Sequence, residues 1–324
     1  MSASRVGVAL MALCAAVVAM TILLTQAPAT EPTGEATRPP STSPRSTAPP
    51  TPDSPTVRVT SIPALLSALA NNSLDEIVVA NGTYRVSPAA YQRADSLWIG
   101  ARFAWRTRPI LVRAETTGGV TFDGGGADDF GGISFQEGAH DQTWQGFVFT
   151  HGSPVESGVI MFGGYPGSPG AHNITLLDIT VDHVGTPGAP RGHAVYFSES
   201  VGGGHDILID GLTVSDPLGG IKAALHFYHS DAANRNAWNV TVRRLQVSGT
   251  DQAIVVWDPT LRNITVDTAT ITNALRVAVR YESAGASGIT FANITSTGSG
   301  SSQGFYSSLG TAPAGVTFVN NSLR

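Results

Sequence analysis

The chain has 324 residues, a formal net charge of −5 at pH 7, and 13% charged residues. This sparse, slightly acidic charge provides no basic stripe to neutralise phosphates, so we expect no nucleic-acid partner. The single cysteine, Cys14, lies in the N-terminal apolar segment, so the rest of the chain must be stable without disulfides.

The first 56 residues differ in composition from the rest. Residues 6–24 form an uncharged apolar run behind Arg5, and small residues follow it. This order is typical of an export signal over residues 1–29, and the run is also long enough to be an uncleaved membrane anchor. Residues 30–56, rich in Pro, Thr and Ser, predict a disordered linker. We therefore expect residues 57–324 to be a secreted or extracytoplasmic domain, in contact with a membrane only through an uncleaved N-terminus.

One helix is predicted at the start of that domain, over residues 61–70. Ser61 suits the N-cap and Pro63 the first turn, while Leu65, Leu66 and Leu69 form an apolar face. A terminal unit of a repeat array needs a cover for its open core, so we expect this helix to cap the N-terminal end.

From residue 119 onward, short apolar strands recur in two registers. Strands of the first register follow one another by 25 to 36 residues, and each begins with a small residue. They start at Gly132, Gly158, Ala194, Ala224, Ala253 and Ala278. Strands of the second register start at His172, His205, Trp238, Arg262 and Ser287. Strands this short must stack on their copies, and two or three of them in about 30 residues fit one turn of a parallel β-helix better than a propeller blade.

The segment Ile77-Val78-Val79-Ala80-Asn81-Gly82-Thr83-Tyr84, behind a capping helix, resembles the opening of pectin-lyase-like β-helix proteins. The later Asn-Ile-Thr strands are similar to their coil repeats, and the likeness is nearest to secreted bacterial relatives of the alginate and chondroitin lyases. It implies an all-β fold over residues 57–324: a single-stranded, right-handed parallel β-helix, or solenoid, with a short N-terminal capping α-helix. The superfamily includes polysaccharide lyases, hydrolases, epimerases and non-enzymatic adhesins, so the fold alone selects no activity.

Alternation along the first-register strands predicts which side chains face solvent. The expected inward residues are Ile133, Val159, Val195, Leu225, Ile254 and Val279, together with Phe135, Met161, Phe197, Phe227, Val256 and Tyr281. The expected outward columns are Ser134, Ile160, Tyr196, His226, Val255 and Arg280, and beside them Gln136, Phe162, Ser198, Tyr228, Trp257 and Glu282. Polar and aromatic residues therefore gather on the middle coils, although any solvent-facing β-helix sheet carries some of both.

This patch suits a polysaccharide, because aromatic rings cover the C–H faces of sugars and polar groups bind their hydroxyls or carboxylates. A lyase acting on a uronate polymer by β-elimination needs carboxylate neutralisation, a base and an acid. We predict Arg280 for the first role, His226 as the base, and Tyr196 or Tyr228 as the acid. The predicted substrate-binding residues are Trp257, Glu282, Asp258, Glu199 and His229.

Other assignments fit the same residues. Lys222 is a second candidate base, since the resemblance implies a lysine and an arginine from separate coils, although an ordinary solvated turn lysine is the favoured interpretation. A non-catalytic glycan-binding or cell-envelope module is the main alternative to a lyase. A glycoside hydrolase ranks lower, because its paired carboxylates would have to come from Glu199, Asp258 and Glu282.

The metal and turn residues give weaker signals. The resemblance implies calcium at the substrate carboxylate, but the sequence contains no recognisable calcium cluster of that family. Separately, Asp123, Asp128 and Asp129 in a Gly-rich turn could hold calcium, although solvated turn carboxylates are the favoured interpretation, and we assign no cofactor. The sequon residues Asn173, Asn239 and Asn263 recur in register, which predicts a ladder of stacked, mutually bonded side chains. We expect a monomer.

Overall fold

The computed structural model describes most of the domain behind the N-terminal segment. The described residues are 55–86, 99–100, 106–128, 132–135, 138–153, 158–163, 170–186, 192–198, 204–217, 219–228, 237–299, 304–307 and 315–323. The predicted export signal, almost all of the predicted linker, and the predicted sugar ligands Glu199 and His229 lie outside them. Across the described ranges, no helix has the length and apolar character needed to cross a membrane.

The described chain forms two parallel sheets. The larger sheet, here called sheet A, has the order β1-β2-β5-β8-β11-β13-β15-β17-β19-β21, with β3, β6, β9 and β22 beside this path; sheet B has the order β20-β18-β16-β14-β12-β10-β7-β4. Strands of sheet A are β1 (Thr56–Val59), β2 (Glu76–Val79), β3 (Gly82–Arg85), β5 (Ile110–Ala114), β6 (Val120–Asp128), β8 (His140–Gln145), β9 (Phe147–Ser153), β11 (His172–Asp182), β13 (His205–Ser215), β15 (Trp238–Ser248), β17 (Arg262–Thr272), β19 (Ser287–Thr297), β21 (Val316–Val319) and β22 (Ser322–Leu323). Strands of sheet B are β4 (Ile99–Gly100), β7 (Ile133–Phe135), β10 (Gly158–Phe162), β12 (Gly192–Phe197), β14 (Ile221–Tyr228), β16 (Gln252–Trp257), β18 (Val277–Tyr281) and β20 (Phe305–Ser307).

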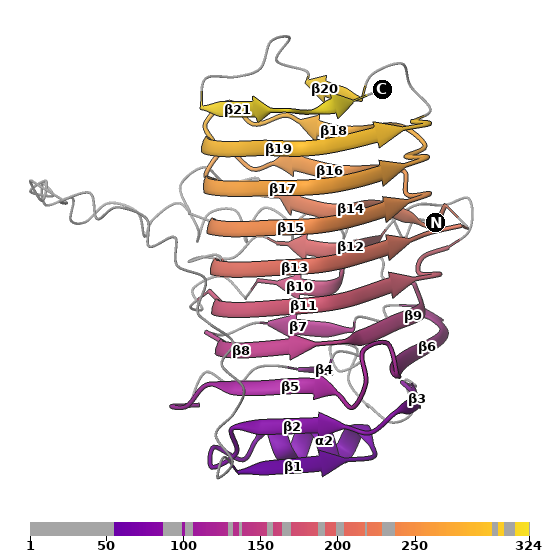
Figure 1. Cartoon of the computed structure of the whole chain (residues 1–324), viewed down its shortest axis with the longest axis vertical. Helices are drawn as coiled ribbons and strands as arrows, with labels where there is room; N and C mark the ends of the chain where they lie inside the picture. Colours follow the sequence, from indigo (N-terminus) through magenta and orange to yellow (C-terminus); the bar gives the residue numbers. More distant parts are fainter. Residues whose placement is uncertain are drawn as a thin grey trace, which may run out of the picture. The chain divides into compact units, whose positions relative to one another are not determined.

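From β10 to β19 the chain alternates strictly between the two sheets, so each coil adds one strand to each. In Figure 1 the strands of sheet A run from left to right in front while those of sheet B return behind them, and successive coils climb from indigo to yellow. This sense of winding is right-handed. The expected all-β, right-handed parallel β-helix is confirmed.

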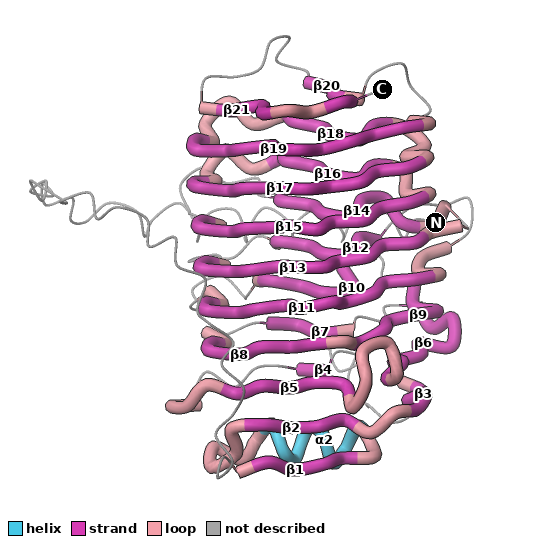
Figure 2. The backbone as a smooth tube through the Cα atoms, in the orientation of Figure 1, coloured by secondary structure: helices cyan, strands magenta, loops and turns pink. Residues whose placement is uncertain are grey.

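The predicted helix is confirmed as α2 (Ile62–Leu69), and it covers the first coil. The hydroxyl of Ser61 accepts a hydrogen bond from the backbone N–H of Ala64 at 3.2 Å, and Leu65 and Leu69 are fully buried. Figure 2 shows the helix, in cyan, against β1 and β2. The buried guanidinium of Arg106 donates hydrogen bonds to three backbone carbonyls at and after the end of the helix, including that of Leu69 at 3.0 Å.

Each long strand of sheet A contains a left-handed residue near its middle. In β15 this residue is Arg244, with φ of 54°; before it Val240 and Val242 are buried, and after it Leu245 and Val247 are buried. The equivalent residues are Asp178, Gly211, Thr268 and Asn293. The alternation of buried and solvent-facing residues therefore shifts by one position at the left-handed residue. This shift occurs at the same point in each of these strands, and it lets one strand follow the core around a bend.

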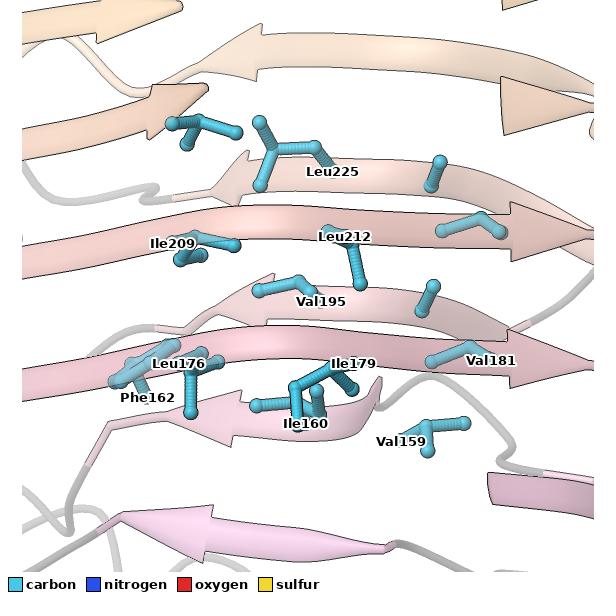
Figure 3. Close-up of a cluster of buried hydrophobic side chains, with 14 of the residues drawn as sticks. Val159, Ile160, Phe162, Leu176, Ile179, Val181, Val195, Ile209, Leu212 and Leu225 are labelled. Atoms are coloured by element: carbon cyan, nitrogen blue, oxygen red, sulfur yellow. The ribbon is translucent and has the colours of Figure 1, made fainter. Parts of the chain in front are cut away.

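Aromatic rings stack through the core from coil to coil. The rings of Phe135, Phe162, Phe197 and Phe227 follow one another with centroid separations of 5.1, 4.8 and 4.5 Å. The expectation that Met161 points inward and that Ile160 and Phe162 point outward is wrong: Ile160 pairs with Ile133 and Val195, and both Ile160 and Phe162 are fully buried, while Met161 is partly exposed. Figure 3 shows Ile160 and Phe162 among the buried side chains between the sheets.

The predicted ladder of turn residues is confirmed at the start of the long strands. The amide of Asn263 donates to Asn239 at 3.1 Å, that of Asn239 donates to Asp206 at 3.1 Å, and that of Asn173 donates to Asp141 at 3.3 Å. All five residues have a positive φ between 53° and 54°. Asn and Asp tolerate this left-handed conformation better than other residues with a side chain, so the ladder stabilises the turn in successive coils.

Candidate functional site

The outer face of sheet B carries the predicted polar and aromatic column. Backbone register aligns Tyr196 with His226, His226 with Val255, Val255 with Arg280, and Arg280 with Tyr306. On the earlier coils the same column holds Met161 and Ser134, so Met161 replaces the expected Ile160. Because parallel strands lie about 4.8 Å apart, this column places its members one coil spacing from each other.

Aromatic side chains surround the middle of this face. The ring centroids of Tyr196 and Tyr228 lie 6.3 Å apart in a stacked arrangement, and His226 lies 5.3 Å from Tyr196 and 5.7 Å from Tyr228. On the next coil Trp257 meets Tyr228 edge to face at 5.8 Å and is 44% exposed. The structure thus brings Tyr196, His226, Tyr228 and Trp257 together, with Trp257 as the most accessible ring of the four.

His226 is only 5% exposed, although it belongs to the outward column. Its neighbours along the strand, Leu225 and Phe227, fill the core, so the imidazole is buried on the outer side of the sheet and not inside the β-helix. Its Nδ1 lies 3.0 Å from Nε2 of His193, whose ring is 2% exposed and stacks on Tyr196 at 4.8 Å. His226 therefore has a histidine as its hydrogen-bond partner, a contact that the sequence analysis did not predict.

Both imidazoles are held neutral. Burial, reinforced by the positive charges of Lys222 and Arg280, lowers the pKa of His226 to about 3. Burial, followed by His226 and Lys222, also lowers the pKa of His193 well below its usual range. A base whose conjugate acid has a pKa near 3 is a weak proton acceptor, which argues against the predicted role of His226 as the base.

Arg280 is held in place from several sides. Its guanidinium donates to Glu282 at 2.8 Å and to the side-chain oxygen of Gln252 at 3.2 Å. It also lies over the rings of Trp257 and Tyr306, 5.5 and 5.9 Å from their centroids. Its Nε is buried and has no hydrogen-bond partner within the described part of the chain. Glu282, predicted to bind sugar, therefore serves first as the partner of Arg280.

The remaining predicted site residues fall in different places. Lys222 lies near the start of β14, is partly buried, and forms no ion pair with any other described residue; its charge acts on both histidines. Asp258 is fully buried in the turn after β16, where one carboxylate oxygen accepts hydrogen bonds from the backbone N–H and hydroxyl of Thr260, both at 2.7 Å. This carboxylate stabilises a turn and does not face the polar column.

Sequence reasoning missed His193, Gln252 and Tyr306. His193 and Gln252 both align with Ala223. This position lies directly before the predicted first residue of each strand, which is Ala194, Ala224 or Ala253. Two polar residues at that position were the available signal. The strand β12 shifts register between Gly192 and His193, and simple alternation cannot anticipate such a bulge.

The described residues contain no group of three or more His, Cys, Asp or Glu side chains that could hold a metal ion. Of the candidate calcium ligands, Asp123 accepts hydrogen bonds from the backbone N–H of Gly125 at 2.8 Å and lies 3.2 Å from Nδ1 of His151. The side chain of Asp128 and the whole of Asp129 lie outside the described residues.

A shallow polar groove of about 420 Å³ lies on sheet A, away from the column of sheet B. Gly211 leaves a gap there between Asp178 and Arg244, and threonines from neighbouring coils, among them Thr180 and Thr213, form the rest of its floor. Arg244 is ion-paired with Asp178 at 3.1 Å. In contrast to sheet B, the described residues that line this groove include no aromatic ring.

No protein-family model matches the sequence, and a comparison with curated proteins gives no match. Solved structures with some similarity include the PL6 family alginate lyase AlyGC, at 14% identity and a TM-score of 0.47, covering 75% of this chain and 35% of that one. Another is an alginate lyase from Paenibacillus sp. str. FPU-7, at 13% identity and 0.31, covering 82% and 99%. A third is the catalytic domain of a GH87 α-1,3-glucanase in complex with tetrasaccharides, at 13% and 0.25, covering 85% and 70%. This chain thus spans about a third of the length of AlyGC.

Proposed function

We propose that the protein binds a uronate-containing polysaccharide on the outer face of sheet B and cleaves it by β-elimination. One observation carries the proposal: two cations, Lys222 and Arg280, act on a buried, neutral His226 in a column bordered by aromatic rings. Arg280 is paired with Glu282, whereas Lys222 forms no ion pair with another described residue. A cation without a counter-charge and a buried N–H without a partner favour an anion, and exposed rings beside them favour a sugar.

The exposed rings favour an anion that is carried on a sugar. Trp257 and Tyr306 are 44% and 40% exposed, and both lie against the guanidinium of Arg280. A sugar ring on Trp257 would bring a carboxylate on that ring close to Arg280. Small inorganic anions would make no use of these aromatic faces, whereas a uronate polymer would use both the faces and the charge.

In this proposal, Arg280 stabilises the uronate carboxylate and the negative charge that develops on it as the C5 proton leaves. Tyr196, Tyr228 and Lys222 are the remaining candidates for proton transfer, since the pKa of about 3 makes His226 a poor base. A hydrolase is less well supported, because among the described carboxylates of this region Glu282 is paired with Arg280 and Asp258 is buried in its turn.

Binding without cleavage is the second candidate. It is favoured by the same Arg280, whose hydrogen bonds to Glu282 and Gln252 hold it rigidly between two exposed rings, a geometry that binds sugar without any proton transfer. We further propose that either activity takes place outside the cytoplasm, on the basis of the export-type composition of residues 1–29.

Incubation of the protein with alginate, pectate and glycosaminoglycans tests the proposal, with the ultraviolet absorbance of unsaturated uronate ends as readout. We expect product from at least one polymer, and a loss of at least tenfold in Arg280→Gln. The matched control is Arg58→Gln, which removes an exposed arginine paired with Glu115 at 2.8 Å in the first coil and should leave activity unchanged.

Retention of a polymer on an affinity gel without product, lost in Arg280→Gln, would support the binding module over the lyase. Neither product nor retention across the panel would contradict the proposed function.

A further inference from the structure

The guanidinium of Arg280 is anchored by two different side chains, one at each of its amino groups. Nη2 donates a hydrogen bond to Glu282 at 2.8 Å, and Nη1 donates one to Oε1 of Gln252 at 3.2 Å. Gln252 is 1% exposed, whereas the side chains of Arg280 and Glu282 are 22% and 12% exposed. The anchor at Nη1 is therefore the more deeply buried of the two, and a ligand on the outer face would not contact it.

The amide of Gln252 lies between two charged groups that cannot exchange hydrogen-bond roles. Its Nε2 donates to Oδ2 of Asp251 at 3.3 Å, and the same carboxylate oxygen is ion-paired with Arg276 at 3.0 Å. An ionised carboxylate only accepts hydrogen bonds, and a guanidinium only donates them. The N–H end of the amide therefore faces Asp251 and its carbonyl end faces Arg280, so both partners determine the same orientation.

Hydrogen bonds to the backbone fix the position of this amide as well. Gln252 is the first residue of β16, and the buried hydroxyl of Thr250 donates to its backbone carbonyl at 2.8 Å. The backbone N–H of Arg276, directly before β18, donates to the backbone carbonyl of Asp251 at 2.8 Å. The polar network from Arg276 through Asp251 and Gln252 thus connects the starts of two neighbouring strands to Arg280 in the outward column.

We infer that Gln252 is a positioning residue: its amide, oriented by Asp251, holds the guanidinium of Arg280 where it receives a carboxylate of the ligand. This place lies against the exposed rings of Trp257 and Tyr306. Without the anchor, the guanidinium would have to be ordered when the ligand binds, which costs affinity. The ligand half of this inference rests on the proposed function, whereas the anchoring of Arg280 is a property of the free protein.

Nitrogen NMR of the arginine side chains tests the anchoring in the free protein. Rotation about the Nε–Cζ bond exchanges Nη1 with Nη2, and hydrogen bonds to two separate acceptors oppose it. We therefore expect two resolved Nη signals for Arg280, identified by their loss in Arg280→Lys. In Gln252→Met, which keeps the length of the side chain but removes the amide, this exchange should be about fivefold faster, the effect of one hydrogen bond. A single averaged Nη signal in the wild type would overturn the inference, whether or not any variant folds.

Two further variants separate the hydrogen bond from packing. Gln252→Glu keeps an oxygen acceptor for the guanidinium and should keep the exchange slow; exchange as fast as in Gln252→Met would overturn the role of the acceptor. Gln142→Met is the matched control, because Gln142 is also 1% exposed and accepts a hydrogen bond from Nε1 of Trp144 at 3.0 Å, but lies in β8 of sheet A. It should leave the signals of Arg280 unchanged, and a change as large as in Gln252→Met would overturn the inference.

Affinity for an oligogalacturonate or oligoalginate probe tests the ligand half. We expect a loss of about fivefold in Gln252→Met and none in Gln142→Met. Asp251→Ala should cost less than Gln252→Met and add no further loss in the double variant, because Asp251 acts only through the amide. An additive loss in the double variant would overturn the orienting role of Asp251.

Unchanged or higher affinity in Gln252→Met would overturn the positioning role. If the Nη signals behave as expected but neither probe binds the wild type, the proposed function fails together with the carboxylate assignment, while the anchoring of Arg280 stands. The two failures are therefore distinguishable.

Discussion

Mild acid should destabilise the protein through its buried histidine pair. The pKa of His226 is about 3 in the folded protein against an ordinary value of 6.5, so below pH 6.5 the unfolded chain takes up a proton that the folded chain refuses. The stabilisation is fully present above pH 6.5 and is lost as the pH falls toward 3. Between pH 7 and pH 5, protonation of the unfolded chain at this one residue lowers the free energy of unfolding by about 2 kcal/mol. His193 adds to the loss in the same direction.

Urea unfolding followed by circular dichroism at pH 7, 6 and 5 measures this loss. The double variant His193→Met/His226→Leu is the control, because it removes both groups that must stay neutral, and its free energy of unfolding should vary much less over the same range. Equal stability of the wild type at pH 7 and pH 5 would refute the reasoning, as would an equal loss in the double variant.

Three further substitutions test the fold. Phe197→Ala, in the middle of the stacked core rings, should lower the free energy of unfolding by about 3–5 kcal/mol, and a loss below 1 kcal/mol would contradict its place in the core. Arg106→Ala should cost about 3 kcal/mol and speed hydrogen exchange in α2, where the guanidinium binds the carbonyl of Leu69; unchanged exchange would show that this contact does not hold the cap. Asn239→Ala should destabilise the protein by about 1 kcal/mol more than Asn239→Gly, since only glycine accepts a φ of 53° without strain, and equal effects in urea melts would argue against a strained turn.

The β-helix could be predicted because turn residues mark the start of each repeat. Asn and Asp recur at the turn that needs a left-handed residue, as in Asn239 and Asn263, and Val, Ile and Thr alternate behind them. Strand β10 lacks such markers: Gly158–Phe162 is apolar throughout, so alternation alone could not fix its phase. Its register is set by the stacking of Phe162 between Phe135 and Phe197, a contact between coils that the local sequence does not contain.

The candidate site was predictable only in part. Alternation correctly placed Tyr196, His226 and Arg280 in one column, because backbone pairing follows directly from the repeat. The burial of His226 and its bond to His193 depend on a register shift at the start of β12 and on side-chain packing across coils. The low pKa of His226, which argues against a role as base, follows from that burial.

A crystal structure with a uronate oligosaccharide bound would test the central claim most directly. We predict that the sugar lies along the outer face of sheet B, with a ring on Trp257 and a carboxylate within hydrogen-bond distance of the guanidinium of Arg280. An oligosaccharide bound instead in the groove of sheet A beside Gly211, with the face of sheet B empty, would contradict it.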